Sequence, residues 1–384
     1  MIRVDKLIPG GQAIGTAPDG RKVFFWNALP GETVVEYDIT KKKSHYYEAI
    51  ASKIENLSPY RVNPLDPCYL STSPWQILDW DYENREKSAL VTEVFHEHHI
   101  DVSVPSIVTD GTSYHYRNKM EYSLYWDNNS SKIELAFHTR GSHRKLPITQ
   151  SSIERPEIFE GATRIVEDLN IHHEEARTYQ SLLLRCNSDG VVSGGLYRNG
   201  EPHPVFSPLT DTILGHTYSY SPNGFFQINL PVYELALKEI KQHITTDEVL
   251  DLYSGVGTIG LSVARDHYLT LVESDKSAYA ELLNNAHGLS NVTSILDKSE
   301  NVLGYISPTA TVILDPPRAG CDAKLIDRLL EVAPPVIIYL SCNPATQARD
   351  VSMLLDKYAI SHIQPFNFFP RTPHIENLVI LSLK

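Results

Sequence analysis

The cysteine at position 342 stands where a nucleophilic side chain would be useful. Cys342 follows the apolar run Val336–Ser341, which predicts a buried strand, and precedes the turn residues Asn343-Pro344. In an open α/β sheet, ligands bind in the crevice outside the carboxyl ends of the strands. Most lone cysteines are small buried hydrophobic residues, but a thiolate beside a ligand crevice is a nucleophile. We therefore favour a reactive thiol at Cys342 over a core thiol.

Two carboxyl groups occupy similar positions. Asp315 ends the apolar run Thr311–Asp315 and opens the turn Asp315-Pro316-Pro317-Arg318, whose prolines fix φ and hold the acid rigidly. Glu376 precedes the last β-type run of the chain, and a carboxylate in the wall of a crevice is a candidate general base. Taken alone, however, such a proline turn is as often an ordinary turn, and Glu376 would be interpreted as a solvated loop acid.

No metal site is predicted from the sequence. His374 has no partner histidine at ligand spacing, so we expect a positioning or structural role for it. The chain has four cysteines, and none forms a C-x-x-C pair, which argues against a disulfide framework, a zinc site or a metal cluster. We assign no chemistry to Cys186 and Cys321.

A glycine-rich segment lies between a predicted strand and a predicted helix. Gly255, Gly257 and Gly260 follow the strand Val249–Tyr253 with the spacing G-x-G-x-x-G. Glycine lets the backbone turn sharply and approach a ligand closely. The spacing predicts a cofactor site, but dinucleotide-binding enzymes share it, so it does not identify the cofactor.

Acids that follow the next two predicted strands complete a nucleoside site. Glu273 ends the strand Leu269–Glu273 and can accept hydrogen bonds from both ribose hydroxyls of an adenosyl group. Asp297 follows a further β-type run, where it can meet the adenine amino group. Both NAD and S-adenosylmethionine carry this ribose, so these residues leave the choice between them open.

The elements that must position these residues change in type along the chain. Residues 1–61 contain short β-rich runs, such as Val23–Trp26, which predict a small barrel of the OB type. Residues 62–220 form a predicted β-rich central domain, with a helix near 84–98 that we expect to pack on the last domain. Residues 221–384 alternate strands and helices, which predicts an α/β domain with a parallel sheet.

The composition is that of a globular protein with an acidic surface. The formal net charge of −13 counts against binding of a polyanion by the whole surface but leaves room for a local basic face. Three short basic runs, at 41–43, 117–119 and 140–145, are candidates, although on composition alone each is better interpreted as a solvated charge run. Because the chain shows neither a signal peptide nor a long apolar run, we expect a cytoplasmic protein without a membrane partner.

Together the motifs resemble those of the RNA 5-methyluridine methyltransferases, which modify the T-loop of tRNA and sites in large-subunit rRNA. The resemblance extends over nearly the whole chain. Ser341-Cys342-Asn343-Pro344 is similar to the nucleophile motif of the family, and His374-Ile375-Glu376 is similar to its base motif. The segment Asn223–Asn229 is similar to the one that leads into the catalytic domain, and residues 1–61 resemble a TRAM domain, an RNA-binding barrel.

The resemblance implies a function for each candidate residue. The chain would be a monomeric enzyme that methylates C5 of a uridine in rRNA or tRNA, with S-adenosylmethionine as methyl donor. Cys342 would be the covalent nucleophile and Glu376 the base, and the uridine would flip out of the RNA to reach them. The C-terminal domain would be a Rossmann-like class I methyltransferase domain. The expected cofactor-binding residues are Gln227, Tyr253, Gly255, Gly257, Glu273, Asp297 and Asp315. Asp297 is included because of the strand pattern alone.

One departure from the family pattern affects the expected cofactors. Many members hold a four-iron cluster through four cysteines that follow the TRAM domain. Here Cys68 has no further cysteine in Pro67–Gln76, and Ser151 stands where the last ligand is expected. One thiolate cannot hold such a cluster, so we expect no iron–sulfur cluster. The departure weakens assignments borrowed from cluster-bearing rRNA enzymes, and the sequence leaves the RNA class and the target uridine open.

Two other functions fit part of the sequence. An RNA 5-methylcytosine methyltransferase generally has a second cysteine in the catalytic turn, but here Arg318 follows Pro316-Pro317. A catalytically inactive RNA-binding or chaperone homologue would not need Cys342, Glu376 and the glycine loop together. The preferred function is therefore uracil-C5 methylation, with the inactive homologue as the alternative.

Overall fold

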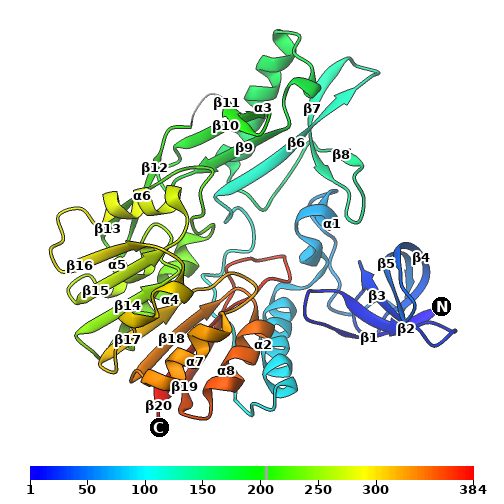
Figure 1. Cartoon of the computed structure of the whole chain (residues 1–384). Coiled ribbons are helices and arrows are strands. Elements are labelled where there is room, and N and C mark those ends of the chain that lie inside the picture. The colour runs from blue at the N-terminus through cyan, green and yellow to red at the C-terminus, as the bar shows by residue number, and fades with distance from the viewer. Residues whose placement is uncertain (204–205) are drawn as a thin grey trace.

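The N-terminal part of the chain forms a closed five-stranded barrel. The computed structural model describes residues 1–203 and 206–384, and Figure 1 shows the barrel at the N-terminal end. Its strands close in the order β1-β2-β3-β5-β4. They are β1 (Ile2–Leu7), β2 (Ala13–Thr16), β3 (Lys22–Trp26), β4 (Thr33–Lys42) and β5 (Tyr46–Glu55). Alternate residues such as Val23 and Phe25 point into the barrel core, as the period of a half-buried strand requires.

A helical segment connects the barrel to the rest of the chain. It contains α1 (Tyr69–Thr72), the short 3₁₀ helix η1 (Pro74–Ile77) and α2 (Trp80–Glu97). Asp79 caps α2 by accepting hydrogen bonds from the backbone N–H groups of Asp81 and Tyr82. Helix α2 lies between the barrel and the C-terminal part and contacts α8 (Pro344–Leu354) there (Figure 1).

The central part contains a six-stranded antiparallel sheet in the order β11-β10-β9-β6-β7-β8. The strands are β6 (Lys119–Asp127), β7 (Lys132–His138), β8 (Lys145–Pro147), β9 (Ser181–Cys186), β10 (Val192–Arg198) and β11 (Glu201–His203). Helix α3 (Pro156–Ile171) packs on β7 and β9, and the 3₁₀ helix η2 (Ala176–Thr178) precedes β9. A separate hairpin of β12 (Leu209–Ile213) and β13 (His216–Tyr220) leads into the C-terminal part.

The C-terminal part is a seven-stranded sheet in the order β16-β15-β14-β17-β18-β20-β19. Strands β14 to β18 are parallel, and β20 runs antiparallel to both of its neighbours. The strands are β14 (Glu248–Leu252), β15 (Tyr268–Glu273), β16 (Val292–Leu296), β17 (Ala310–Leu314), β18 (Val336–Ser341), β19 (Tyr358–Phe366) and β20 (Glu376–Leu383). The connecting elements are α4 (Leu230–Gln242), α5 (Thr258–Val263), α6 (Lys276–Asn285), η3 (Ser299–Asn301), η4 (Leu303–Tyr305), α7 (Ala323–Val332) and α8.

Both faces of this sheet are buried. Val312 and Leu314 of β17 pack into the core that contains α2, α7 and α8, whereas Ile313 packs into the core that contains α4 and α5. Burial on both faces explains why these strands are continuous apolar runs rather than alternating ones. The predicted fold class, α/β with an OB-type barrel and a Rossmann-like C-terminal domain, is confirmed. The boundaries of the three predicted domains remain predictions. Within the described residues, no helix combines the length and apolar character needed to cross a bilayer.

Candidate active site

The carboxyl ends of three neighbouring parallel strands bring the candidate residues to one edge of the sheet. Leu252, Leu314 and Tyr339 lie side by side in register on β14, β17 and β18. The glycine loop, Asp315 and Cys342 follow these strands, and all three therefore begin at the same edge, as expected for an open α/β sheet.

The antiparallel strand β20 adds Glu376 to the same edge. The last paired residues of β18 and β20 are Ser341 and Asn377, so Cys342 and Glu376 are the next pair in register. Side chains of opposed residues point to the same face of an antiparallel pair. The negative charge of Glu376 accordingly contributes to the raised pKa of the Cys342 thiol.

Cys342 is the partly exposed member of the four cysteines, all of which lie in described segments. Its pKa is raised to about 11, mainly by burial and further by Glu376 and Asp315, whereas Arg318 lowers it through charge and a hydrogen bond. The thiol lines a cavity of about 210 Å³ together with Arg318 and His374. The other three thiols are buried, and burial raises each of their pKa values.

Arg318 is a site residue for which the sequence analysis predicted no role. The turn that carries it is tied to the cysteine loop, because Asn343 Nδ2 and Thr346 Oγ1 donate hydrogen bonds to the Arg318 carbonyl at 2.9 and 3.2 Å. Its Nη2 lies 3.4 Å from Nδ1 of His374. Burial and Arg318 lower the pKa of His374 to about 4, so this imidazole is neutral and its Nδ1 can accept a hydrogen bond from the Arg318 guanidinium. The signal in the sequence was a cation directly after two rigid prolines.

A half-buried carboxyl group, Asp315, and a buried one, Glu376, flank the thiol. Burial raises the pKa of Asp315 to about 7, and it raises that of Glu376 well above the ordinary value. Asp315 raises the Glu376 pKa further, while Arg318 lowers it. A carboxyl group whose pKa is raised by burial is a stronger base, once it is ionised, than an exposed carboxyl group.

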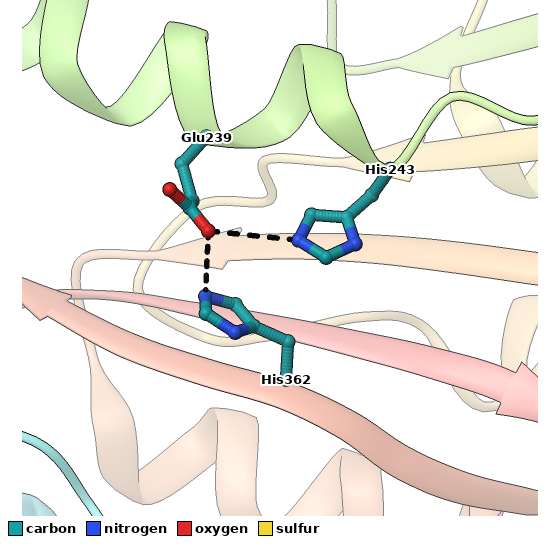
Figure 2. Close-up of side chains that lie close together, drawn as sticks. All are labelled: Glu239, His243 and His362. Atoms are coloured by element: carbon teal, nitrogen blue, oxygen red, sulfur yellow. Dashed lines mark ion pairs between the residues drawn. The ribbon is translucent and has the colours of Figure 1, made fainter.

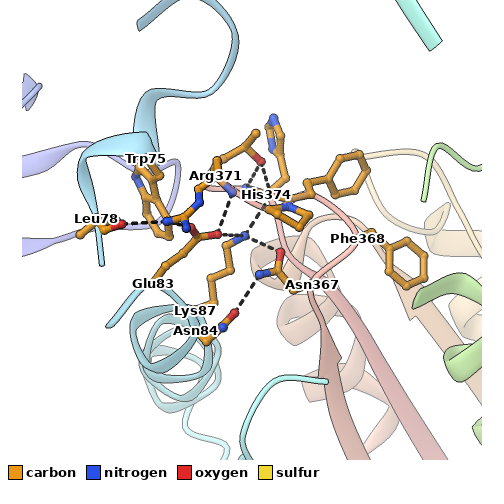
Figure 3. Close-up of polar contacts among 12 residues, drawn as sticks. Trp75, Leu78, Glu83, Asn84, Lys87, Asn367, Phe368, Arg371 and His374 are labelled. Atoms are coloured by element: carbon orange, nitrogen blue, oxygen red, sulfur yellow. Dashed lines mark hydrogen bonds and ion pairs between the residues drawn. The ribbon is translucent and has the colours of Figure 1, made fainter. Parts of the chain in front are cut away.

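A buried polar network holds the loop that leads to Glu376 (Figure 3). Lys87 of α2 donates hydrogen bonds to Asn367 Oδ1 at 2.7 Å and to the Phe369 carbonyl at 3.0 Å. Glu83, one turn earlier on α2, accepts a hydrogen bond from the backbone N–H of Arg371 at 2.9 Å. Glu376, the candidate base, therefore lies at the end of a loop that α2 fixes at several points.

The barrel reaches the same loop. A Cβ atom added to Gly11, which has φ +89°, would lie 2.1 Å from Cβ of Pro373. The Gly11 carbonyl also accepts a hydrogen bond from Trp75 Nε1 at 2.9 Å. Pro9 and Gly10 of the same barrel turn line the cavity beside Cys342. The N-terminal domain thus forms part of the wall around the thiol.

The glycine loop is folded around two acids. Asp251 Oδ2 accepts a hydrogen bond from Gly260 N–H at 2.9 Å, and Glu273 Oε2 accepts one from Gly255 N–H at 2.8 Å. A Cβ on Gly260 would lie 2.6 Å from Leu271, but one on Gly255 would meet nothing within 4 Å. Gly255 therefore borders open space, whereas Gly260 is needed for packing.

Asp251 was not among the predicted site residues. Its carboxyl group is fully buried, its pKa is raised to about 8, and its Oδ1 has no hydrogen-bond partner among the described residues. Tyr253, which follows β14, has φ +67°, a conformation that is costly for an aromatic residue. Such strain is concentrated at ligand sites, which is consistent with a cofactor loop.

The remaining cofactor candidates differ in their surroundings. The Gln227 carbonyl accepts a hydrogen bond from Asn118 Nδ2 at 2.9 Å, which ties this segment to the central sheet. Glu273 Oε1 also accepts hydrogen bonds from Ser274 and Asp275, so fewer of its lone pairs remain for a ribose than the sequence analysis assumed. Asp297 is exposed beyond β16 and accepts a hydrogen bond from Asn301 Nδ2 at 2.7 Å.

The candidate basic runs make contacts within the protein. The guanidinium of Arg140 lies 4.1 Å from the ring centre of Trp26, which joins the central part to the barrel. Lys119 Nζ donates hydrogen bonds to the carbonyls of Asn223 and Gly224 at 3.1 and 3.2 Å. Arg140 and Lys119 therefore hold neighbouring segments of the protein in place, and this role is separate from any contact with RNA.

The fold and the C-terminal segment of the site have known counterparts. The Pyrococcus abyssi tRNA (uracil-54, C5)-methyltransferase, solved in complex with S-adenosyl-L-homocysteine, aligns over 100% of both chains with a TM-score of 0.76 and 23% identity. A family model described as tRNA (Uracil-5-)-methyltransferase matches residues 306–384, which contain Asp315, Cys342 and Glu376. An uncharacterized RNA methyltransferase of Bacillus anthracis is 27% identical over 446 aligned positions, covering 100% of this chain and 96% of the relative.

These matches support the RNA 5-methyluridine methyltransferase family for this chain. The resemblance found in the sequence is thereby confirmed. A further relative of this methyltransferase, an uncharacterized RNA methyltransferase of Prochlorococcus marinus, is 29% identical over 420 aligned positions, covering 92% of this chain and 99% of the relative. The methyltransferase therefore matches these relatives across their length and not in the catalytic part alone.

Proposed function

We propose that the methyltransferase transfers the methyl group of S-adenosylmethionine to C5 of a uridine in tRNA or rRNA, with Cys342 as covalent nucleophile. The observation that carries the proposal is the register of β18 and β20, which makes a partly exposed thiol and a buried carboxyl group neighbours. Uracil C5 methylation needs one nucleophile for C6 and one base for the C5 proton, and Cys342 and Glu376 supply them.

The bond changes at the uracil ring follow from these two residues. The Cys342 thiolate adds to C6, and the electrons of the C5–C6 double bond move towards C5 and O4. After C5 has gained its methyl group, the Glu376 carboxylate takes the C5 proton. The C5–C6 double bond then re-forms and the C6–S bond breaks, which returns the thiolate. Arg318, which lowers the thiol pKa, favours the attacking form.

The strand ends fit a positively charged adenosyl donor. S-adenosylmethionine, when bound, supplies an electrophilic methyl group on a sulfonium. The raised pKa values of Asp251 and Asp315 come from burial, and a neighbouring cation would favour their ionised forms. The open space beside Gly255 also fits a bound nucleoside. We assign donor binding to Gln227, Tyr253, Gly255, Gly257, Glu273, Asp297 and Asp315.

We assign RNA recognition to the barrel and the central sheet. A uridine that enters the cavity beside Cys342 meets barrel residues Pro9 and Gly10 on one wall. A uracil in a stacked or paired base cannot reach the thiol, so the nucleotide must flip. The T-loop of tRNA is the first substrate to test, because the Pyrococcus abyssi protein of the same fold is named for uracil-54 of tRNA.

The experiment that tests the proposal measures methyl transfer from labelled S-adenosylmethionine to unmodified tRNA and rRNA transcripts. Mass spectrometry of the product should find 5-methyluridine. RNA with 5-fluorouridine at the target should form a stable covalent complex, because fluorine cannot leave C5 as a proton. Cys342→Ala should abolish the complex, and Cys68→Ser, a change at a buried thiol, should leave it intact.

Three outcomes would contradict the proposal. A methyl group found on cytidine or on ribose would exclude uracil C5 as the acceptor. Covalent trapping that survives in Cys342→Ala would show that another residue is the nucleophile. The absence of transfer to either RNA, with retained RNA binding, would instead favour the inactive homologue.

A further inference from the structure

A glutamate and two histidines from separate elements meet at a second place in the methyltransferase sheet (Figure 2). Glu239 lies on α4, and His243 caps the C-terminal end of the same helix one turn later. His362 comes from the edge strand β19. His362 Nε2 lies 3.1 Å from Glu239 Oε1, and His243 Nε2 lies 3.6 Å from the same oxygen. One donor atom from each residue lies within 4.8 Å of the other two.

The three side chains are not explained by hydrogen bonding alone. His362 Nε2 is buried, and although it lies 3.1 Å from Glu239 Oε1, it has no hydrogen-bond partner among the described residues. A buried polar nitrogen without a partner is costly. The rings of His243 and His362 are also 5.0 Å apart, so protonating both would place two positive charges together. Burial and His243 lower the pKa of His362, while Glu239 opposes this effect.

We propose that Glu239, His243 and His362 bind a divalent transition-metal ion of the zinc type. Two neutral imidazoles and a carboxylate are donors that Zn²⁺, Ni²⁺ and Co²⁺ accept, whereas Mg²⁺ and Ca²⁺ prefer sets made of oxygen. Zinc–nitrogen bonds are about 2 Å long. Small rotations of the three side chains would therefore bring their donor atoms to bonding distance from one ion. The side chains are 27 to 30% exposed, which leaves the ion's remaining positions to water.

Such an ion would connect two segments that approach the active site from different directions. Helix α4 begins after Asn229, whose Nδ2 donates a hydrogen bond to the Phe368 carbonyl at 3.2 Å. Strand β19 ends at Phe366, just before the loop that carries the base. The ion would therefore stabilise the packing of α4 on the edge strand, and it lies outside the set of residues assigned to methyl transfer.

The test is titration of the full-length protein with Zn²⁺, followed by calorimetry, in the Cys342→Ala background so that the accessible thiol cannot bind the metal. We expect one equivalent to bind and the melting temperature to rise by about 2 °C or more with excess metal. His243→Ala and His362→Ala should each weaken binding at least tenfold. His172→Ala is the matched control, because His172 forms an i,i+4 pair with Asp168 at 3.5 Å but belongs to no three-residue cluster in the described parts of the chain.

A second readout does not depend on stability. Co²⁺ bound by two imidazoles and a carboxylate should give visible absorption bands that disappear in His362→Ala and weaken in Glu239→Gln. Zn²⁺ or Co²⁺ binding that is unchanged in His243→Ala and His362→Ala would overturn the proposal. So would an equal loss in His172→Ala, or a wild-type protein that binds no equivalent of either metal.

Discussion

The ammonium group of Lys87 lies 3.0 Å from the carboxylate of Glu83, and neither side chain is exposed to solvent. Both residues belong to α2, yet their remaining contacts go to the loop between β19 and β20. Arg371 Nη1 lies 3.5 Å from the same carboxylate. A connecting helix, far from Cys342 and Glu376 in sequence, therefore carries the charges that hold the loop that leads to Glu376.

Removing one partner of this pair should destabilise the protein. Lys87→Met leaves Glu83 with Arg371 as its remaining cation, so we expect a loss of about 3 kcal/mol in the free energy of unfolding. The double variant Lys87→Met/Glu83→Gln removes both charges of the pair but leaves Arg371 without its carboxylate, so its loss should be smaller than the sum of the two single losses. Denaturant unfolding of the two single variants and the double variant measures the coupling. If the effects of the single changes simply add, the pair is not coupled.

The reactivity of Cys342 should depend on pH as its raised pKa requires. Below a pKa of about 11 the thiolate fraction rises about tenfold for each pH unit, so alkylation by iodoacetamide should be about a hundredfold faster at pH 9 than at pH 7. Arg318→Gln removes the cation that lowers this pKa, so it should slow alkylation at every pH in that range. Mass spectrometry of the peptide containing Cys342 measures the rate. A rate independent of pH would mean that the thiol is already ionised near neutrality.

Glu376→Gln should separate addition at C6 from proton removal at C5. The amide cannot take the C5 proton, so methyl transfer turnover should fall by a factor of about 10² to 10⁴. The covalent complex with ordinary uridine should accumulate, because its breakdown requires that proton to leave. Gel electrophoresis under denaturing conditions detects the complex. Its absence in Cys342→Ala/Glu376→Gln is the control, and normal turnover in Glu376→Gln would assign the base elsewhere.

Gly255 and Gly288 provide a matched pair for the donor site. Both have positive φ, +57° and +81°, and a Cβ on either would meet nothing within 4 Å. Alanine at either position should therefore cost a similar stability, about 1 kcal/mol of backbone strain. Only Gly255→Ala should weaken S-adenosylmethionine binding, by about tenfold or more, because its methyl group enters the space assigned to the donor. Equal affinities in both variants, measured by calorimetry, would place the donor elsewhere.

The sequence predicted the elements whose signal is local. Val336–Ser341 is a continuous apolar run because both faces of β18 are buried, and its bounds agree with the structure. The placement of Asp315 and Cys342 at one edge followed from the rule that parallel strands end together. By contrast, β19 contains several polar residues and Pro365 at the edge of the sheet, so its pattern did not stand out.

The residues that sequence reasoning missed act through contacts between distant segments. In the sequence, Lys87 is indistinguishable from a solvent-exposed lysine on an amphipathic helix. Only the folded chain brings it to Asn367. The Glu239 and His243 spacing was visible in the sequence, but their third partner lies on β19, more than a hundred positions later. Arg318 was adjacent to a recognised motif, yet its effect on the thiol depends on how the proline turn meets the cysteine loop.

The contact between the barrel turn and Pro373 has a consequence for how this enzyme selects its RNA. Because Gly11 leaves no room for even a methyl group there, the barrel cannot shift without moving the segment next to His374 and Glu376. The N-terminal domain is therefore not an independent RNA-binding module that could be removed without changing the site. A truncated protein beginning at residue 62 would retain every reacting group and still lack one wall of the chamber. If RNA binds the barrel as proposed, the same binding also positions Glu376, the proposed base.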